Sequence, residues 1–363
     1  MLKFLLKLSL VVVLIATGFL GWAWQGVPQY PDHQSAEYSC NNEAPADEDS
    51  LTDFKVLSFN VQYMASKNYV FFYDMDGATD SQPSMEHVQL TLDRVADIIR
   101  DEDPDVVLIQ EINDATDSRT HNYDQISALQ QRLGKEAFPC ESSAYYWKAD
   151  YVPHPKIAGS VGMKLLTLSR HPIVQSDRYQ LPLMPMDPVS QRFYFQRALL
   201  ETHLQVGEQV VAVLNTHYDA WGEGTDVMRG QVAATQKRLE ALDAAGIPWV
   251  LGGDFNLLPP DGDRQRPRIE QAGTGIYDKD TAIAPLYQNY GAIPSLENLN
   301  SAEEARWYTH LSNDPRVTAP DRTIDYLFYS NQWQLQNSYI RQRDTLDISD
   351  HLPVVGVFAL SLP

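Results

Sequence analysis

Hydrophobic positions along the chain switch between short apolar runs and longer stretches with a helical period. The run 56–59 predicts a strand that ends at Asn60, and the run 106–109 predicts a second strand that ends at Gln110 and Glu111. Between these runs, apolar residues recur at helical spacing after Pro83-Ser84. We therefore predict a strand, helix, strand unit in which the second strand ends in an acid.

The second half of the chain repeats this plan. A strand over 210–214 ends at Asn215-Thr216-His217, a helix covers about 226–245, and a strand over 248–251 leads into Gly252-Gly253-Asp254. No residue-level repeat accompanies the similarity. Two such halves, packed sheet against sheet with their helices outside, would bring the strand ends to one rim. Strand ends that meet at one rim can form an active site.

The first 24 residues have the layout of an export segment. Two lysines, Lys3 and Lys7, precede an unbroken apolar stretch over 8–24. The stretch is nearly long enough to span a bilayer, for which roughly 17 to 25 residues suffice. Residues 1–24 are therefore either a cleaved signal peptide or a retained membrane anchor. Both alternatives make the rest of the chain extracytoplasmic, whether periplasmic, secreted or membrane-anchored, because the lysines stay on the cytoplasmic side.

The next segment is polar and carries one of the two cysteines. Residues 25–53 are expected to form an acidic flexible tether, since Asn, Asp, Glu, Ser and Pro dominate 31–53 without an apolar period. Cys40 and Cys140 are the two cysteines. In an exported chain they either form a disulfide that ties the tether to the body, or remain two buried thiols. The folded domain is expected to cover 54–363.

Composition and charge narrow the choice of partners. The chain has 363 residues, of which 44% are hydrophobic, so it can bury a large core. It carries 28 Lys and Arg against 48 Asp and Glu, a formal charge of −20, which argues against a tight nonspecific nucleic-acid binder. A nuclease is not excluded, because a metal site and a few arginines can act over a short contact. We interpret the one local basic cluster, 264–268, as a solvated loop.

Six short motifs occur in an order that resembles a known superfamily. They are Leu57-Ser58-Phe59-Asn60, Ile109-Gln110-Glu111, Asn215-Thr216-His217, Gly252-Gly253-Asp254-Phe255-Asn256, Thr323-Ile324-Asp325-Tyr326 and Ser349-Asp350-His351-Leu352-Pro353. Together they resemble the endonuclease/exonuclease/phosphatase superfamily, which includes deoxyribonuclease-I-like nucleases. The resemblance covers about 54–360. It implies a four-layer α/β sandwich of two packed mixed β-sheets flanked by helices, and a divalent-metal-dependent phosphoric ester hydrolase that uses Mg²⁺ or Mn²⁺.

The resemblance also implies a metal site. Glu111 would be the principal metal ligand, with Asn60 supporting it and Asp350 facing the metal. Oxygen donors of this kind are the ligands that Mg²⁺ prefers.

The remaining implied roles concern water and phosphate. Asp254 would orient or deprotonate the attacking water, and Asn256 would donate to phosphoryl oxygens. His351 would contact the phosphate or take a proton, with Asp325 fixing its tautomer. The other implied residues are a second imidazole, His217, and two candidate substrate-binding cations, Arg197 and Arg322. Lys164 stands where many relatives carry a small or apolar residue, which leaves the leaving-group acid unassigned, and no role is expected for His154, His171, His203 or His310.

Three functional hypotheses follow. The leading one is an exported metal-dependent phosphodiesterase or phosphatase that acts on a lipid or small phosphoester, with membrane association through residues 1–24. The second is an extracytoplasmic endonuclease of the deoxyribonuclease-I type, favoured by the two imidazoles and opposed by the net charge. The third is a non-catalytic binding module on the same scaffold, which should lack some of the expected ligands, whereas all of them are present. The sequence does not determine the oligomeric state.

Overall fold

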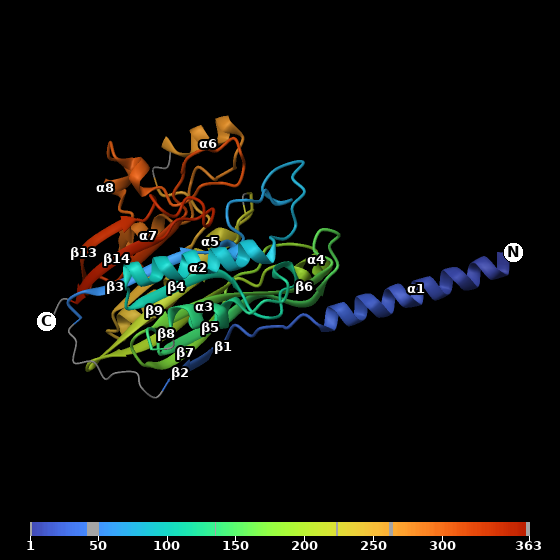
Figure 1. Cartoon of the computed structure of the whole chain (residues 1–363), viewed down its shortest axis with the longest axis horizontal. Helices are drawn as coiled ribbons and strands as arrows, with labels where there is room; N and C mark the ends of the chain where they lie inside the picture. Colours follow the sequence, from blue (N-terminus) through green and yellow to red (C-terminus); the bar gives the residue numbers. More distant parts are fainter. Residues whose placement is uncertain (1, 42–50, 135, 223, 261–263, 361–363) are drawn as a thin grey trace.

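Two seven-stranded sheets pack face to face, and helices cover their outer faces (Figure 1). The computed structural model describes residues 2–41, 51–134, 136–222, 224–260 and 264–360. Both sheets are mixed, because β3 and β4 in one, and β9 and β10 in the other, run parallel among antiparallel neighbours. The predicted four-layer α/β sandwich is confirmed.

The strands of each sheet come from both ends of the described chain. The first sheet has the order β1 (His33–Ser35), β7 (Ile173–Gln180), β8 (Ala198–Val206), β9 (Gln209–His217), β10 (Trp249–Asp254), β12 (Asp325–Tyr329) and β11 (Gly291–Ile293). The second has the order β13 (Trp333–Ile340), β14 (Val354–Leu360), β3 (Phe54–Asn60), β4 (Val106–Asn113), β6 (Gly159–Ser169), β5 (Cys140–Val152) and β2 (Glu37–Cys40).

Alternation along the strands divides the apolar side chains between the layers. In β4, Val106 and Leu108 pack between the sheets, whereas Val107 and Ile109 pack against the outer helices. In β10, Val250 faces the other sheet while its two neighbours face the helical layer. Strands buried on both faces appear as continuous apolar runs, which is the pattern that the sequence shows.

The helices begin and end close to the predicted positions. α2 (Met85–Glu102) starts at Ser84, whose side chain accepts a hydrogen bond from the backbone N–H of His87. α5 (Val227–Ala244) stops before Gly246, which has a φ of 69°. The other helices are α1 (Leu2–Gln25), α3 (Gln125–Leu133), α4 (Pro188–Phe193), α6 (Arg266–Ala272), α7 (Ala284–Asn289) and α8 (Leu296–Leu299), with short 3₁₀ turns at Gln62–Met64, Ser118–Thr120 and Glu304–Trp307.

The N-terminal segment forms one long helix that projects from the body (Figure 1). Within the described residues, Phe4–Gln25 is a helix long and apolar enough to cross a membrane, with a mean hydropathy of 2.3. Within the described part of this helix only Ala23, in the last turn, is buried, whereas Trp24 and the apolar side chains from Phe4 to Trp22 are exposed. The apolar run therefore does form a helix of spanning length.

The expectation of a flexible tether over 25–53 is wrong for residues 33–40. These residues form β1, which pairs with β7, and β2, which pairs with β5. Backbone pairing with the two sheet edges orders a polar segment that has no apolar period of its own. Residues 42–50, which belong to the same expectation, lie outside the described residues.

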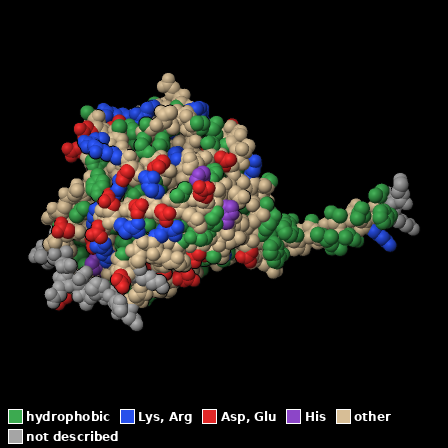
Figure 2. All heavy atoms as spheres, in the orientation of Figure 1, with side chains coloured by type: hydrophobic (Ala, Val, Ile, Leu, Met, Phe, Trp, Pro, Cys, Tyr) green, Lys and Arg blue, Asp and Glu red, His purple; other side chains and the backbone are tan. Residues whose placement is uncertain are grey.

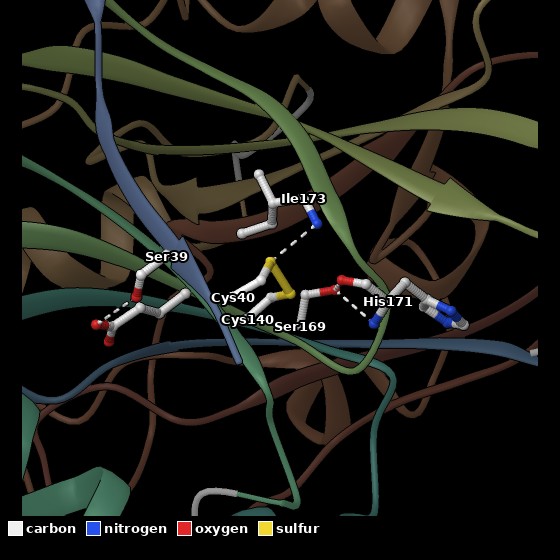
Figure 3. The surroundings of a disulfide bond; sticks show 7 residues. Ser39, Cys40, Cys140, Ser169, His171 and Ile173 are labelled. Atoms are coloured by element: carbon white, nitrogen blue, oxygen red, sulfur yellow. Dashed lines mark hydrogen bonds between the residues drawn. A yellow bond between two sulfur atoms is a disulfide. The ribbon is translucent and has the colours of Figure 1, made fainter. Parts of the chain in front are cut away.

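Cys40 and Cys140 are joined in a disulfide with a Cα–Cα distance of 4.1 Å (Figure 3). The bond closes a separation of 100 residues, for which the loop-entropy model gives about 4 to 5 kcal/mol. Cys40 lies at the end of β2 and Cys140 at the start of β5, so the bond fixes an edge strand to its neighbour. Of the two alternatives left open by the sequence, the paired one is observed.

Candidate active site

Four predicted site residues continue the inward face of their strands. Asn60, His217, Asp254 and Asp325 have the same parity as residues of β3, β9, β10 and β12 that pack between the sheets. Asp254 pairs in register with His217 on one side and with Asp325 on the other. Three strands thus deliver three polar side chains side by side at the rim of the sandwich.

Glu111 reaches the same place through a local irregularity. The register between β4 and β6 shifts between Ile109 and Ile112, and Glu111 has a φ of 57°. A non-glycine residue rarely adopts this backbone conformation, and bulges re-aim side chains. Simple alternation would turn Glu111 toward the outer helices; instead its carboxylate accepts a hydrogen bond from Asn60 at 3.1 Å.

Asn60 links the two halves of the site. Its amide nitrogen also donates to Asp254 at 3.1 Å, while its oxygen accepts from the backbone N–H of Gln62 at 3.0 Å. In this orientation Asn60 holds two carboxylates in place with its nitrogen. It therefore orients Glu111 and Asp254 through hydrogen bonds.

His351 lies between three carboxylates. Its Nδ1 contacts both oxygens of Asp325 at 2.9 Å, and its Nε2 lies 3.5 Å from Asp254 and 3.9 Å from Asp350. Although burial alone would lower it, these carboxylates raise the pKa of His351 well above its ordinary value. The contact with Asp325 fixes the orientation of the ring through Nδ1, and Nε2 faces Asp254 and Asp350.

His217 lies on the other side of Asp254. Its Nε2 is 3.3 Å from Asp254, its Nδ1 is 3.8 Å from Glu111, and the buried Nδ1 has no hydrogen-bond partner among the described residues. Burial, together with Arg197 and His351, lowers the pKa of His217 well below its usual value. The site thus pairs a charged imidazole with a neutral one, a difference that suits acid and base roles.

The carboxylates of the site have unmet negative charge. Burial and the charge of Asp350 raise the pKa of Glu111. Burial also raises the pKa of Asp254, to about 7, despite the opposing effect of His351. Asp350 itself accepts from Gln62 at 3.1 Å. Burial and mutual repulsion disfavour the ionised form of these acids, so a bound cation at this place would stabilise it.

The donor set fits a hard divalent cation. Ligand atoms of Glu111, His217 and Asp254 lie within 4.8 Å of one another, as do those of His310, Asp350 and His351. Carboxylate oxygens suit Mg²⁺ and Mn²⁺, and the imidazoles suit a softer ion as well. The excess of acid over base among the buried groups is what favours a bound cation.

The two predicted arginines differ. Arg197 donates from Nε to Asp219 at 3.2 Å, and its buried Nη1 has no partner among the described residues. Arg322 is fully engaged by Asp321, Thr274 and the hydroxyl of Tyr277. Both line the cleft, yet only Arg197 keeps a donor for a substrate oxygen. The role expected for Arg322 is therefore not supported, because its guanidinium braces the loop at 274–277.

The Gly252-Gly253 pair and Asn256 also stabilise the local fold, which the motif alone does not indicate. A Cβ at Gly252 would lie 2.7 Å from Leu327, and one at Gly253 would lie 2.1 Å from the backbone oxygen of Thr216. The glycines thus allow close packing of strands. Asn256 has a φ of 51° and donates to the backbone oxygen of Tyr218 at 3.2 Å, while its side chain lines the cleft.

Three further residues lie at the site, and the sequence had assigned no catalytic role to them. His310, for which no role was expected, stacks edge-on against His351 at 4.8 Å, and its own pKa is lowered by burial. Burial and Asp350 raise the pKa of Asp74 to about 7, and Asp74 lines the cleft. Tyr146 is fully buried, packs 5.4 Å from His217, and leaves its hydroxyl without a partner among the described residues.

Lys164 and the basic cluster lie apart from the site. Lys164 contacts Ser143 at 3.2 Å and Glu37 at 3.6 Å, and it lines a second, separate cavity. In the cluster, Arg266 pairs with Glu270 and Arg268 bonds to Tyr308. The expectation of a solvated loop over 264–268 is wrong in part, because Arg266 begins α6 and Gln265 is buried.

The cleft above the site has a volume of about 690 Å³. Its floor holds the polar residues described above, and aromatic and aliphatic side chains form its walls. Volumes of several hundred Å³ with a few convergent polar groups are typical of small-molecule sites. The lining residues that matter below are Trp147, Val152, Met186, Val189, Phe193, Trp221 and Ile276.

Comparisons with known proteins agree with the geometry. The model of the endonuclease/exonuclease/phosphatase family matches residues 57–351. Among curated proteins, no sequence matches the chain significantly. A solved endonuclease/exonuclease/phosphatase structure from Beutenbergia cavernae is 22% identical, covers 85% of this chain and 72% of its own, and has a TM-score of 0.56.

Two other solved structures share the fold. ANGEL2, described as a 2′,3′-cyclic phosphatase, is 15% identical, with a TM-score of 0.55 over 91% of this chain and 99% of its own. The human Nocturnin catalytic domain, solved with a bound sulfate, is 17% identical, with a TM-score of 0.51 over 90% of this chain and 97% of its own. Identities this low establish the fold alone. The family match extends over most of the chain, from the start of the first motif to His351 in the sixth, and the chain therefore belongs to the endonuclease/exonuclease/phosphatase family.

Proposed function

We propose that this protein is an exported, divalent-metal-dependent phosphoester hydrolase that acts on a lipid or small phosphoester. One observation carries the proposal: Glu111, Asp254 and His351, far apart in the sequence, meet at one rim through contacts of 3.1 to 3.5 Å. The convergence around shared negative charge suits a cation and a phosphate together.

The chain's own residues have separable tasks in this mechanism. Glu111 and Asp350 would hold the cation, and the amide of Asn60 fixes the orientation of Glu111. When bound, a divalent cation would supply stabilisation of negative charge on a phosphoryl oxygen. Asp254 orients the attacking water and accepts its proton, for which a raised pKa of about 7 is suited.

The imidazoles and Arg197 act on the phosphate side. His351, kept charged by Asp325, donates from Nε2 to a phosphoryl oxygen. Asn256 and the free Nη1 of Arg197 donate to other oxygens of the same group. His217, held neutral by burial, is the second imidazole across the scissile bond.

The extracytoplasmic location is part of the proposal. The helix over Phe4–Gln25 is long enough for a signal or an anchor, and the disulfide suits an oxidising compartment. We propose that α1 is retained, because its last turn packs on the body: Arg192 donates to the backbone oxygens of Trp24 and Val27 at 2.9 and 2.5 Å.

The direct test is hydrolysis of bis-p-nitrophenyl phosphate by the purified full chain. We expect activity with Mg²⁺ or Mn²⁺, complete loss with EDTA, and recovery when metal is returned. Asp254→Asn, which preserves the shape of the side chain, is expected to remain inactive under every condition. Activity that survives complete metal removal would contradict the proposed mechanism.

A nuclease remains the second candidate. His217 and His351 flank Asp254 at 3.3 and 3.5 Å, an arrangement that suits diester cleavage, whereas the net charge of −20 opposes contact with a polyanion. Rates on plasmid DNA, sphingomyelin and phosphatidylinositol lipids, compared at one salt concentration, separate the two candidates. Preference for plasmid DNA would favour the nuclease.

A further inference from the structure

The base of α1 packs against a wall of the active-site cleft. Phe193, at the end of α4, lines the cleft and also contacts Trp24 with ring centroids 6.3 Å apart. The neighbouring Arg192 lies over the same Trp24 ring at 5.2 Å and donates to the backbone of α1. α4 therefore sits where α1 leaves the body, as Figure 1 shows.

A second contact lies on β5. Tyr151 packs against Phe19 and Trp22 of α1, with ring centroids 5.0 and 6.1 Å apart. The next residue, Val152, is buried and lines the cleft. Adjacent residues of one strand thus contact α1 and the cleft. The helix and the cleft mouth share one edge of the molecule.

The cleft mouth on this edge is apolar and exposed. Met186 and Val189, just before and within α4, are 41% and 57% exposed, and both line the cleft. Trp221 and Ile276, which also line it, are 53% and 70% exposed. Figure 2 shows hydrophobic surface continuing from α1 onto the adjoining part of the body, whereas charged side chains gather farther from α1. Exposed apolar groups that cluster around a cleft mark a contact surface.

The occupant of this surface is a bilayer. A helix of 24 residues is about 36 Å long, enough to cross the hydrocarbon core. Trp22 and Trp24, near its end, are the residue type enriched at membrane interfaces. Phe193 contacts Trp24. Val189 lies about one helical turn before Phe193 in α4, so the two residues are roughly 6 Å apart along the axis of α4.

We propose that the cleft opens onto the membrane in which α1 is anchored, and that the substrate is a phosphate ester of a lipid drawn from that membrane. The inference rests on the proposed function and deepens it. The phosphate lies at His351 and Arg197, and the apolar part of the lipid follows Val152, Met186 and Val189 back to the bilayer. Anchoring replaces a search in three dimensions with one along the surface, where the effective concentration of substrate is high.

A labelling experiment tests the geometry without turnover. The full chain, with a fluorophore on Val189→Cys, is reconstituted in phosphatidylcholine nanodiscs that contain head-group spin-labelled lipid. We expect strong quenching at this position and little at the matched control, Val174→Cys. Val174, on β7, is 48% exposed and follows Ile173, whose backbone N–H contacts Cys40. The Cys40–Cys140 bond lies at the start of β5, whereas Tyr151 lies near the end of that strand. Equal quenching at the two positions, or none at position 189, would overturn the proposed orientation.

A kinetic experiment tests the substrate class. The M186S/V189S variant and the wild type are assayed on phosphatidylcholine vesicles doped with sphingomyelin or phosphatidylinositol phosphates, and on soluble bis-p-nitrophenyl phosphate. Because both residues line the cleft, the readout is the ratio of the vesicle rate to the diester rate. We expect this ratio to fall at least tenfold in the variant, and a ratio equal to that of the wild type would overturn the inference. Wild-type activity on the diester with none on any vesicle lipid would overturn this inference and leave the proposed function intact. Inactivity on the diester as well would count against the proposed function itself.

Discussion

Two buried polar clusters show what distinguishes a brace, whose groups satisfy one another, from a site. The brace lies on β8 and α5, whereas the active-site cluster draws residues from β4, β10, β12 and the segment before β14. In the brace, Glu201 accepts from His203 at 2.6 Å and from both Nε and Nη2 of Arg238. Burial alone would raise the pKa of Glu201, but these partners lower it. One acid therefore faces two bases, and the brace needs no further partner.

The active-site cluster has the opposite balance. Its carboxylates at positions 254, 325 and 350 surround His351, Glu111 lies beside His217, and the pKa values of Glu111 and Asp254 are raised. The two clusters contain the same residue types and are both buried, but only the active-site cluster has more carboxylates than cationic partners. A cluster with more carboxylates than cationic groups is arranged to bind a cation from solution. This excess distinguishes a binding site from a brace.

The largest expected effect comes from replacing the histidine of each cluster by alanine. His351→Ala should lower kcat by roughly 10² to 10⁴, the usual contribution of acid–base groups. His203→Ala, its counterpart in the brace, should leave kcat unchanged and lower Tm. Steady-state rates and melting curves for both variants check the comparison, and an unaltered rate for His351→Ala would refute its assignment.

Removing the acid of the brace should cost stability. Glu201→Gln takes the charge from a bidentate contact with Arg238, which is worth about 1.5 to 3 kcal/mol. Denaturant unfolding at pH 7 measures the loss, and the diester rate of the folded variant should match the wild type.

The pH dependence of that loss has a definite sign. Because the folded-state pKa of Glu201 is lowered, its stabilisation is present above the unfolded value of about 4.3 and disappears as pH falls through the folded value. The difference between wild type and Glu201→Gln should therefore shrink below about pH 4. A constant difference from pH 7 to pH 3 would show that Glu201 contributes by packing alone.

Metal should stabilise the site and not the brace. At ten times its Kd, a cation that binds only the folded state adds about 1.4 kcal/mol. Mg²⁺ or Mn²⁺ should therefore raise Tm for the wild type and for Glu201→Gln, and fail to do so for Glu111→Gln. A metal-induced shift that persists in Glu111→Gln would place the cation elsewhere.

The smallest expected effect is also the most specific. In EDTA, Asp350→Asn should be as stable as the wild type or more stable, by up to roughly 1 kcal/mol, because it relieves the repulsion that raises the pKa of Glu111. The asparagine oxygen can still accept from Gln62. A clear loss of stability, measured by denaturant unfolding in EDTA, would show that the acids of the site are already neutralised by their neighbours.

Much of this molecule follows from local sequence. The resemblance to a superfamily singled out Asp325 and His351. Apolar runs buried on both faces, helical stripes with Ser84 and Gly246 at their limits, and polar residues at strand ends predicted two halves packed sheet against sheet, with Asn60 and Asp254 at one rim. These features are determined by side-chain periodicity and backbone preference within one segment, so they can be found without knowing what the segment contacts.

Tertiary structure alone decided the rest. The turn of Glu111 into the site depends on a bulge against β6, and the inclusion of His310 depends on its contact with His351. Tertiary contacts also decide three other features: the hydrogen bonds of Arg322, the ordering of residues 33–40 by two sheet edges, and the packing of Trp24 against Phe193. Each joins segments that are distant along the chain, and no local pattern encodes such a contact, because its free energy exists only when both partners are in place.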